Sequence, residues 1–183
     1  MLCAFKPETP TNVQTAIEAN TVRVSWSPVY DNGSPLTSYS VYIRQHGTET
    51  YSLETSDCDG ASESVLDLQS CTILLLTLEA DPFFLVGGDS IWAKVSASNF
   101  YGESVLSNAG NNAYYTTEPD APLNLAEDVS KRTSTKVGLT WEDAVNNGGM
   151  PVIDYRIKQR VAEGTYSYIA IGLTQKSFTP SGL

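Results

Sequence analysis

Apolar and polar residues alternate with a period of two along most of the chain. From residue 21 to residue 27, Val22, Val24 and Trp26 would point to one side of a strand and Arg23 and Ser25 to the other, as in a half-buried strand. The same alternation predicts further strands over residues 38–45, 49–55, 71–78, 89–99 and 104–117. No segment shows a convincing helical period. Short strands separated by polar turns predict a β-sandwich.

Part of this pattern occurs twice. The first copy has Val-x-Val-x-Trp at 22–26, Asn-Gly at 32–33 and Tyr-x-Val-x-Ile at 39–43. The second copy has Val-x-Leu-x-Trp at 137–141, Asn-Gly at 147–148 and Tyr-x-Ile at 155–157. Trp26 and Trp141 are 115 positions apart, which is about the size of one small β domain. The 183 residues therefore contain two domains.

A proline-rich stretch separates the two copies. Residues 116–122 contain two prolines within four positions, and such a connector is stiff and cannot donate to a sheet. We expect residues 1–6 to end a preceding segment and residues 7–117 to form the first domain. Residues 118–122 would then be the linker, and residues 123–183 the second domain.

The second copy is shorter than the first. Strands are expected over residues 123–128, 136–142, 153–161, 165–173 and 176–183. Two strands that would match 89–99 and 104–117 are missing, and a sandwich without them exposes core and unpaired edges. The favoured interpretation is a fragment of a longer protein. The alternative is that another chain supplies the missing strands.

These features together resemble a tandem of fibronectin type III domains between Pro7 and Leu183. The resemblance rests on the two tryptophans, the Asn-Gly turns before Tyr39 and Tyr155, Leu78, and the segment Val95-x-Ala97-x-Asn99-x-x-Gly102. A true immunoglobulin domain would have its tryptophan on the third strand beside an inter-sheet disulfide. The resemblance implies an all-β fold of two immunoglobulin-like sandwiches, the second without its last two strands.

Two positions depart from the family's pattern. Ile91 occupies the place of the family's tyrosine corner and has no hydroxyl group. The preceding loop, residues 80–88, is enlarged and contains Phe83 and Phe84. These phenylalanines would either plug the end of the core or form an exposed contact patch. The tryptophan-serine motif of cytokine receptors is absent from residues 104–108.

The cysteines predict one disulfide. Cys58 lies in a polar turn and Cys71 opens the next strand, so a bridge would clamp the loop that joins the sheets and stabilise the domain by about 3 kcal/mol. Two buried thiols are the alternative. A bridge implies an oxidising compartment. Cys3 is then left without an assigned partner.

The net charge of −10 makes nucleic acid an improbable partner. Residues 1–117 carry four basic and thirteen acidic residues, whereas residues 118–183 carry seven and eight. With Ile153, Tyr155 and Ile157 pointing inward, the second domain would present a row of cations on its outer face: Arg156, Lys158 and Arg160. This row could meet the acidic first domain of a neighbouring copy, head to tail, or be an ordinary solvated face. No apolar run reaches the roughly 20 residues of a membrane span.

Catalytic chemistry has few candidates in this chain. His46 is the single histidine and is expected to be an exposed spectator, so no triad can be assembled. Asp57, Asp59 and Glu63 lack the spacing of a calcium loop and are expected to be solvated acids. No cofactor or metal is expected. Asn32-Gly33-Ser34 is a glycosylation sequon, although an Asn-Gly turn needs no glycan to explain it.

The sequence thus predicts a non-enzymatic structural or adhesive module of a longer extracellular or cell-surface protein, for example a building block of a filament. Two alternatives remain open. One is a spacer in a secreted carbohydrate-active enzyme, and the other is a repeat of a giant intracellular scaffold.

Overall fold

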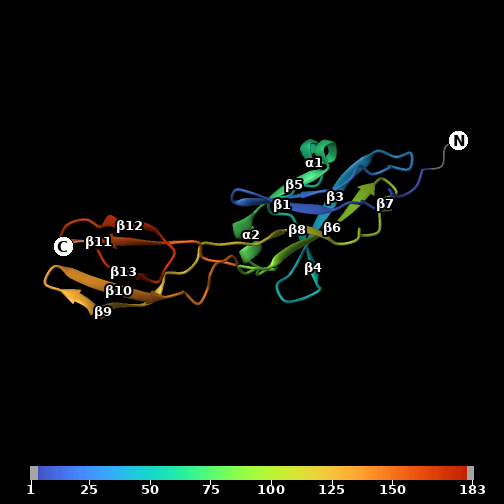
Figure 1. The fold of residues 1–183 in the computed structure, drawn as a ribbon. Coiled ribbons are helices and arrows are strands. Elements are labelled where there is room, and N and C mark those ends of the chain that lie inside the picture. The colour runs from blue at the N-terminus through green and yellow to red at the C-terminus, as the bar shows by residue number, and fades with distance from the viewer. Residues whose placement is uncertain (1–3, 181–183) are drawn as a thin grey trace. The chain divides into compact units, whose positions relative to one another are not determined.

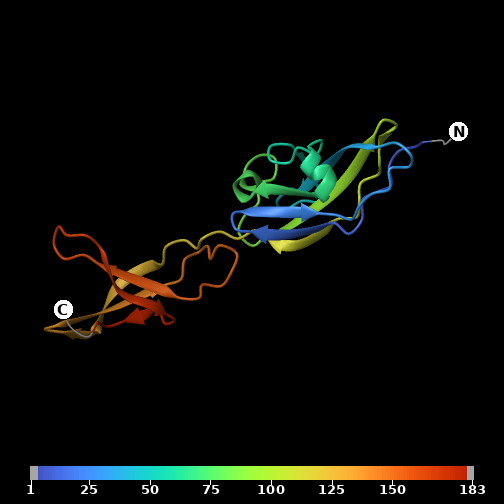
Figure 2. The same ribbon diagram turned by 90° about the horizontal axis from the view of Figure 1, so that it is seen from above.

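The computed structural model describes residues 4–180 of the chain, drawn in two views in Figures 1 and 2. The chain divides into two compact units between Thr116 and Thr117. Unit 1 comprises residues 1–116 and unit 2 residues 117–183. The division falls one residue before residue 117, the expected end of the first domain.

Unit 1 consists of two antiparallel sheets. One sheet has the order β1-β2-β5, formed by β1 (Gln14–Glu18), β2 (Thr21–Ser25) and β5 (Ser70–Leu74). In the other, β3 (Leu36–Arg44) lies between β4 (Tyr51–Glu54) and β6 (Ser90–Asn99). β7 (Gly102–Glu103) and β8 (Gly110–Tyr114) both pair with β6. The chain is mostly β-structure, as predicted.

The alternating apolar residues of these strands build one core between the two sheets. Val22 and Val24 pair with Ile73 and Cys71 across β2 and β5, and all four side chains are buried. Trp26 packs against Tyr39, with their ring centroids 4.9 Å apart. In the register of β3 with β6, Ala97 faces the large ring of Tyr39 and Val95 faces Val41.

The expectation of no helix is wrong at two places. Residues Glu63–Leu68 form α1. Ser62 is its N-cap, and the Ser62 hydroxyl accepts the N–H of Val65 at 3.4 Å. Residues Leu75–Glu79 form α2, where a strand was expected through residue 78. The strand ends at Leu74, whose N–H donates to the carboxylate of Asp57 at 3.0 Å.

Two other strands differ from expectation. β1 lies before the first expected strand and was not predicted. Residues 14–18 contain a single buried side chain and give little alternation. The expected strand over 104–117 is confined to β8, preceded by the two-residue β7.

Unit 2 contains five strands among its described residues. β9 (Leu123–Thr133), β10 (Lys136–Glu142) and β13 (Ser177–Phe178) form a sheet of order β13-β10-β9. β11 (Tyr155–Gln159) pairs with β12 (Ser167–Leu173) in a second sheet. In order and sequence, β10 and β11 correspond to β2 and β3 of unit 1. Up to residue 180, no strand corresponds to β6 or β8.

The core of unit 2 differs sharply from that of unit 1. Among the described residues, 20 of the buried hydrophobic side chains belong to unit 1, and in unit 2 only Trp141 is buried. Trp141 packs against Tyr155, with ring centroids 5.5 Å apart, as Trp26 does against Tyr39. The expectation that Ile153 points inward is wrong, because it precedes β11 and is 85% exposed.

Candidate functional site

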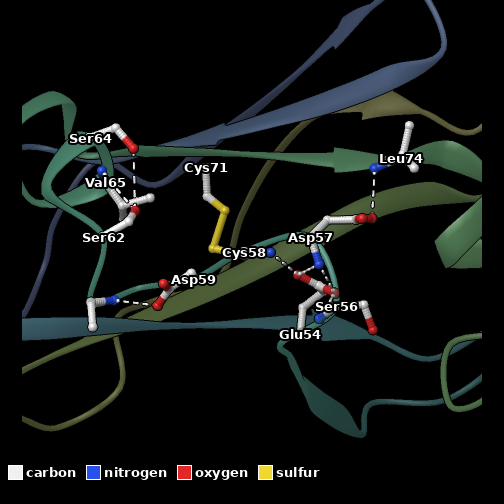
Figure 3. The surroundings of a disulfide bond; sticks show 11 residues. Glu54, Ser56, Asp57, Cys58, Asp59, Ser62, Ser64, Val65, Cys71 and Leu74 are labelled. Carbon is white, nitrogen blue, oxygen red and sulfur yellow. Dashed lines mark hydrogen bonds between the residues drawn. A yellow bond between two sulfur atoms is a disulfide. The ribbon is translucent and has the colours of Figure 1, made fainter.

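The segment between β4 and α2 is fixed by a disulfide (Figure 3). Cys58 and Cys71 are bonded to each other, with their Cα atoms 5.7 Å apart, and both residues are buried. Cys58 lies in the loop after β4 and Cys71 in β5. Because β4 and β5 belong to different sheets, the bond ties the two layers of unit 1 together.

A buried carboxylate organises the same loop. The side chain of Glu54 accepts backbone N–H groups of Ser56 at 2.7 Å, Asp57 at 3.1 Å and Cys58 at 2.9 Å. Figure 3 shows these bonds converging beside the disulfide. Glu54 is only 2% exposed, so the three N–H groups offset the cost of burying its charge.

Of the three acids expected to be solvated, Asp59 and Glu63 are exposed, whereas Asp57 is partly buried. Asp57 accepts from the Leu74 N–H and, at 2.6 Å, from the Thr77 hydroxyl, while Asp59 accepts the N–H of Ala61 at 3.0 Å. Glu63 lies in the first turn of α1. Within residues 4–180, no three His, Cys, Asp or Glu side chains gather as metal ligands would.

The two phenylalanines of the enlarged loop have opposite surroundings. Phe83 is 2% exposed and belongs to the core, whereas Phe84 is 54% exposed. Phe84 also has a φ of 53°, in the left-handed region. Phe83 therefore plugs the end of the core, whereas Phe84 lies at the surface.

His46 helps to hold this loop. Its Nδ1 lies 2.7 Å from a carboxylate oxygen of Asp89, and its backbone N–H donates to the carbonyl of Phe83 at 2.8 Å. The expectation of a spectator histidine is therefore wrong, since His46 connects the β3–β4 turn to the segment before β6.

Position 91 has no tyrosine, but Tyr115 makes a side-chain hydrogen bond elsewhere in unit 1. Ile91 is fully buried and has no side-chain hydroxyl, but its backbone carbonyl accepts the hydroxyl of Thr15 at 3.1 Å. Tyr115, which follows β8, is also buried, and its hydroxyl donates to the carboxylate of Glu79 in α2. Burial raises the pKa of Tyr115, and the hydrogen bond to Glu79 and the charge of that group raise it further.

The Asn-Gly turn of unit 1 binds the segment that precedes β1. Asn32 has a φ of 52°, and its side-chain N–H donates to the carbonyl of Lys6 at 2.7 Å. The N–H of Phe5 donates to the carbonyl of Asn32, and the N–H of Glu8 to that of Tyr30, at 3.2 and 3.0 Å. We call residues 5–8 the first strap.

Unit 2 has an equivalent strap. The N–H of Thr117 donates to the carbonyl of Gly148 at 2.9 Å, and that of Asp120 to the carbonyl of Asn146 at 3.0 Å. In both units the donors are three residues apart and the acceptors two. A Cβ on Gly148 would lie 2.1 Å from the carbonyl oxygen of Thr117, so this approach requires glycine. We call residues 117–120 the second strap.

The sequence contains a signal for the two straps that the strand pattern did not reveal. Pro7-Glu8-Thr9-Pro10-Thr11-Asn12 and Pro119-Asp120-Ala121-Pro122-Leu123-Asn124 share two prolines, an acidic residue and an asparagine at the same spacing. Asn12 and Asn124 also share a positive φ, of 54° and 53°. The internal repeat therefore includes the segment that leads into each unit.

The row of cations in unit 2 lies on the surface. Arg156, Lys158 and Arg160 are all exposed. Lys158 lies over the ring of Tyr168 at 4.7 Å and Arg160 over that of Tyr166 at 5.3 Å. The guanidinium of Arg156 is 3.9 Å from the carboxylate of Asp154. The aromatic rings hold the cationic side chains against β12 without neutralising them.

Comparison with known proteins identifies the domain type. Residues 8–74 match the model of the fibronectin type III domain family. Three solved structures are similar: domains A168–A170 of titin, the FN1–FN3 domains of chicken CNTN1, and titin kinase with its flanking domains. Their sequence identities are 21%, 15% and 15%, and their TM-scores are 0.43, 0.48 and 0.43.

The matches cover 59%, 95% and 76% of this chain, but only 32%, 55% and 28% of the respective structures. The chain therefore spans about half or less of the length of each. None of the helices in the described part of the chain is long and apolar enough to cross a membrane.

Proposed function

The chain belongs, through its first unit, to the fibronectin type III domain family, and on this premise we propose that it is a non-enzymatic structural or adhesive module of a longer extracellular protein. Fibronectin type III domains occur in multidomain adhesive and structural proteins and mediate protein–protein contacts. The observation that carries the proposal is the strap, which ties the incoming segment to each unit by the same pair of hydrogen bonds. A device repeated in this way suits a linear array of units joined by short, proline-stiffened linkers.

The disulfide supports an extracellular or cell-surface location. A bond between Cys58 and Cys71 persists in oxidising compartments and is rare in the cytosol. It therefore favours the extracellular module over the intracellular scaffold repeat. An N-glycan at Asn32 belongs to the same proposal, although the amide of Asn32 also donates to Lys6.

The contacts of the proposed module are electrostatic in part. Arg156, Lys158 and Arg160 form an exposed cationic row in unit 2, and residues 1–117 carry a net charge of −9 from four basic and thirteen acidic residues. Opposite charges on two regions of one chain favour head-to-tail contact between copies. Head-to-tail contacts of this kind would produce a filament where the rotation between successive copies does not close into a ring.

The first experiment is the intact mass of the native protein, measured before and after reduction and deglycosylation. A mass well above 19.8 kDa, with a Cys58–Cys71 peptide in the non-reduced digest, is the expected result. Free thiols at both positions would contradict the extracellular proposal. A catalytic domain in the same polypeptide would favour the enzyme-spacer alternative.

The second experiment tests the head-to-tail contact. Serine substitution of Arg156, Lys158 and Arg160 should reduce self-association at low salt by about tenfold or more. The control replaces Lys131, Arg132 and Lys136, which removes the same charge from another part of unit 2. Sedimentation velocity at two salt concentrations measures both variants. Equal association of the two would remove the cationic row from the proposal.

A further inference from the structure

The dipeptide Asn-Gly occurs at residues 32–33 and again at residues 147–148. An asparagine is chemically labile before glycine, because no side chain hinders the approach of the glycine nitrogen to the asparagine side chain. In both turns the side chain of the preceding residue accepts the glycine N–H at 2.9 Å, from Asp31 in unit 1 and from Asn146 in unit 2. The two turns therefore form a matched pair within one chain.

The acceptors of the two glycine N–H groups differ in charge. Gly33 donates to the carboxylate of Asp31, whereas Gly148 donates to the neutral amide of Asn146. The glycine nitrogen becomes a nucleophile as its proton leaves, so negative charge develops on it. A carboxylate at hydrogen-bond distance opposes this charge, and a neutral amide does not. The electrostatics thus favour attack by the nitrogen of Gly148.

The two asparagine side chains are also held differently. Asn147 is exposed, and its Oδ1 accepts the N–H of Gly149 at 3.0 Å. Attack on Cγ places negative charge on this oxygen, which the N–H stabilises in the manner of an oxyanion hole. Within residues 4–180 the Oδ1 of Asn32 accepts no hydrogen bond, and its amide donates to the carbonyl of Lys6 at 2.7 Å. Asn147 is therefore activated, and Asn32 is held by the first strap.

We propose that Asn147 is a site of spontaneous deamidation, which converts it to aspartate and isoaspartate. The Gly148 nitrogen forms a bond to Cγ of Asn147, the bond from Cγ to Nδ2 breaks, and the Gly148 proton leaves with Nδ2 as ammonia. The resulting cyclic imide takes up one water molecule. Opening at one imide carbonyl gives aspartate. Opening at the other gives isoaspartate, whose main chain runs through the former side chain.

The two products have different effects on the second strap. Aspartate leaves the main chain unchanged, and Asp31 makes the equivalent bond to a glycine N–H in unit 1. Isoaspartate adds a methylene group to the main chain directly before Gly148, whose carbonyl accepts the N–H of Thr117 at 2.9 Å. This approach is close, because a Cβ on Gly148 would lie 2.1 Å from the carbonyl oxygen of Thr117. Isoaspartate therefore releases the second strap, and aspartate keeps it.

Incubation of the intact chain at mildly alkaline pH, followed by peptide mapping with mass spectrometry, tests the site. The peptide that contains Asn147 should deamidate about tenfold or more faster than the peptide that contains Asn32. In concentrated urea the two rates should converge, because unfolding removes both turns. Equal rates in the folded protein, or a difference that persists in urea, would overturn the proposal.

Two reciprocal variants test the effect of the neighbouring charge. Asn146→Asp places a carboxylate on the Gly148 N–H and should slow deamidation of Asn147 by about tenfold. Asp31→Asn removes the carboxylate from the Gly33 N–H and should accelerate deamidation of Asn32. If neither variant changes its rate, the turn geometry does not control the reaction and the proposal fails.

Amide hydrogen exchange at Thr117 tests the release of the second strap. In the isoaspartate form, separated by chromatography, this amide should exchange about tenfold or more faster than in fresh protein. Asn147→Asp represents the other product and should exchange at the rate of fresh protein. An unchanged rate in the isoaspartate form, or an equal acceleration in Asn147→Asp, would overturn the release of the strap.

Discussion

Single polar side chains determine how the long connections of unit 1 are held. Glu54 accepts three backbone N–H groups of the loop that follows it, and Asp57 accepts from residues at the start of α2. Tyr115 donates to Glu79 from the other end of the domain's sequence. Each of these groups is buried or half-buried, where a missing partner would cost about 1–3 kcal/mol.

Tyr115 gives a prediction about the pH dependence of stability. Tyr115→Phe should lower the free energy of unfolding by about 1–2 kcal/mol at pH 8, because Glu79 loses its donor. The pKa of Tyr115 is raised in the folded protein, so folding favours its protonated form. The stabilisation is fully present below the unfolded pKa of about 10 and is lost as the pH rises towards the folded value.

The difference between the wild-type protein and the variant should therefore shrink above pH 10. Urea unfolding at pH 8 to 11 measures it. Tyr114→Phe, at the exposed neighbouring residue, is the matched control. Tyr39, Tyr42 and Tyr51 also have raised pKa values, but they are present in all three proteins and cancel. A difference that does not change with pH would contradict the role of Tyr115.

At the scale of secondary-structure elements, unit 1 is held by one covalent bond between its layers. The disulfide connects the loop after β4 to β5, over a sequence separation of 13 residues. α1 lies within this closed segment. A short closed loop restricts the unfolded chain, and this restriction accounts for most of the stabilisation in the chain-entropy description.

Removal of the disulfide should destabilise unit 1 by about 3 kcal/mol. The variant carries Cys58→Ser and Cys71→Ser, and its unfolding by guanidinium is compared with that of the wild-type protein with and without reductant. Reductant should lower the wild-type midpoint to that of the variant and leave the variant unchanged. If reductant has no effect on the wild-type protein, the bond does not stabilise the fold.

At the scale of the whole molecule, the two units share a strand pattern but differ in how much they bury. Unit 1 has 20 buried hydrophobic side chains in one cluster. Within the described part of unit 2, Trp141 is the one buried hydrophobic side chain. Ile171 and Leu125 are 63% and 67% exposed. Since burial of apolar surface is the main source of stability, the units should not be equally stable.

We expect the two units to unfold in separate steps. Amide hydrogens of β9 to β12 should exchange at least tenfold faster than those of β2, β3 and β6 under native conditions. Hydrogen exchange with mass spectrometry at increasing urea concentration follows both units in one sample. A single cooperative transition with equal protection throughout would contradict this expectation.

The alternation of residues was sufficient to predict most strands of both units, because the two-residue period of a strand is a local property of the chain. The repeated Trp and Tyr positions likewise predicted two sandwiches, and Cys58 and Cys71 were paired from their spacing and setting. The helices α1 and α2 were missed, since each is six residues or shorter and has too few turns for a helical period.

The sequence by itself therefore determined the fold class, the two-unit organisation and the positions of the candidate residues. Only the tertiary structure decided that Phe83 is buried beside an exposed Phe84 and that the hydroxyl of Tyr115 donates to Glu79, 36 positions away. The physical reason is that periodicity arises between neighbours in sequence, whereas hydrogen-bond partners and strand edges depend on residues that only the folded chain brings together.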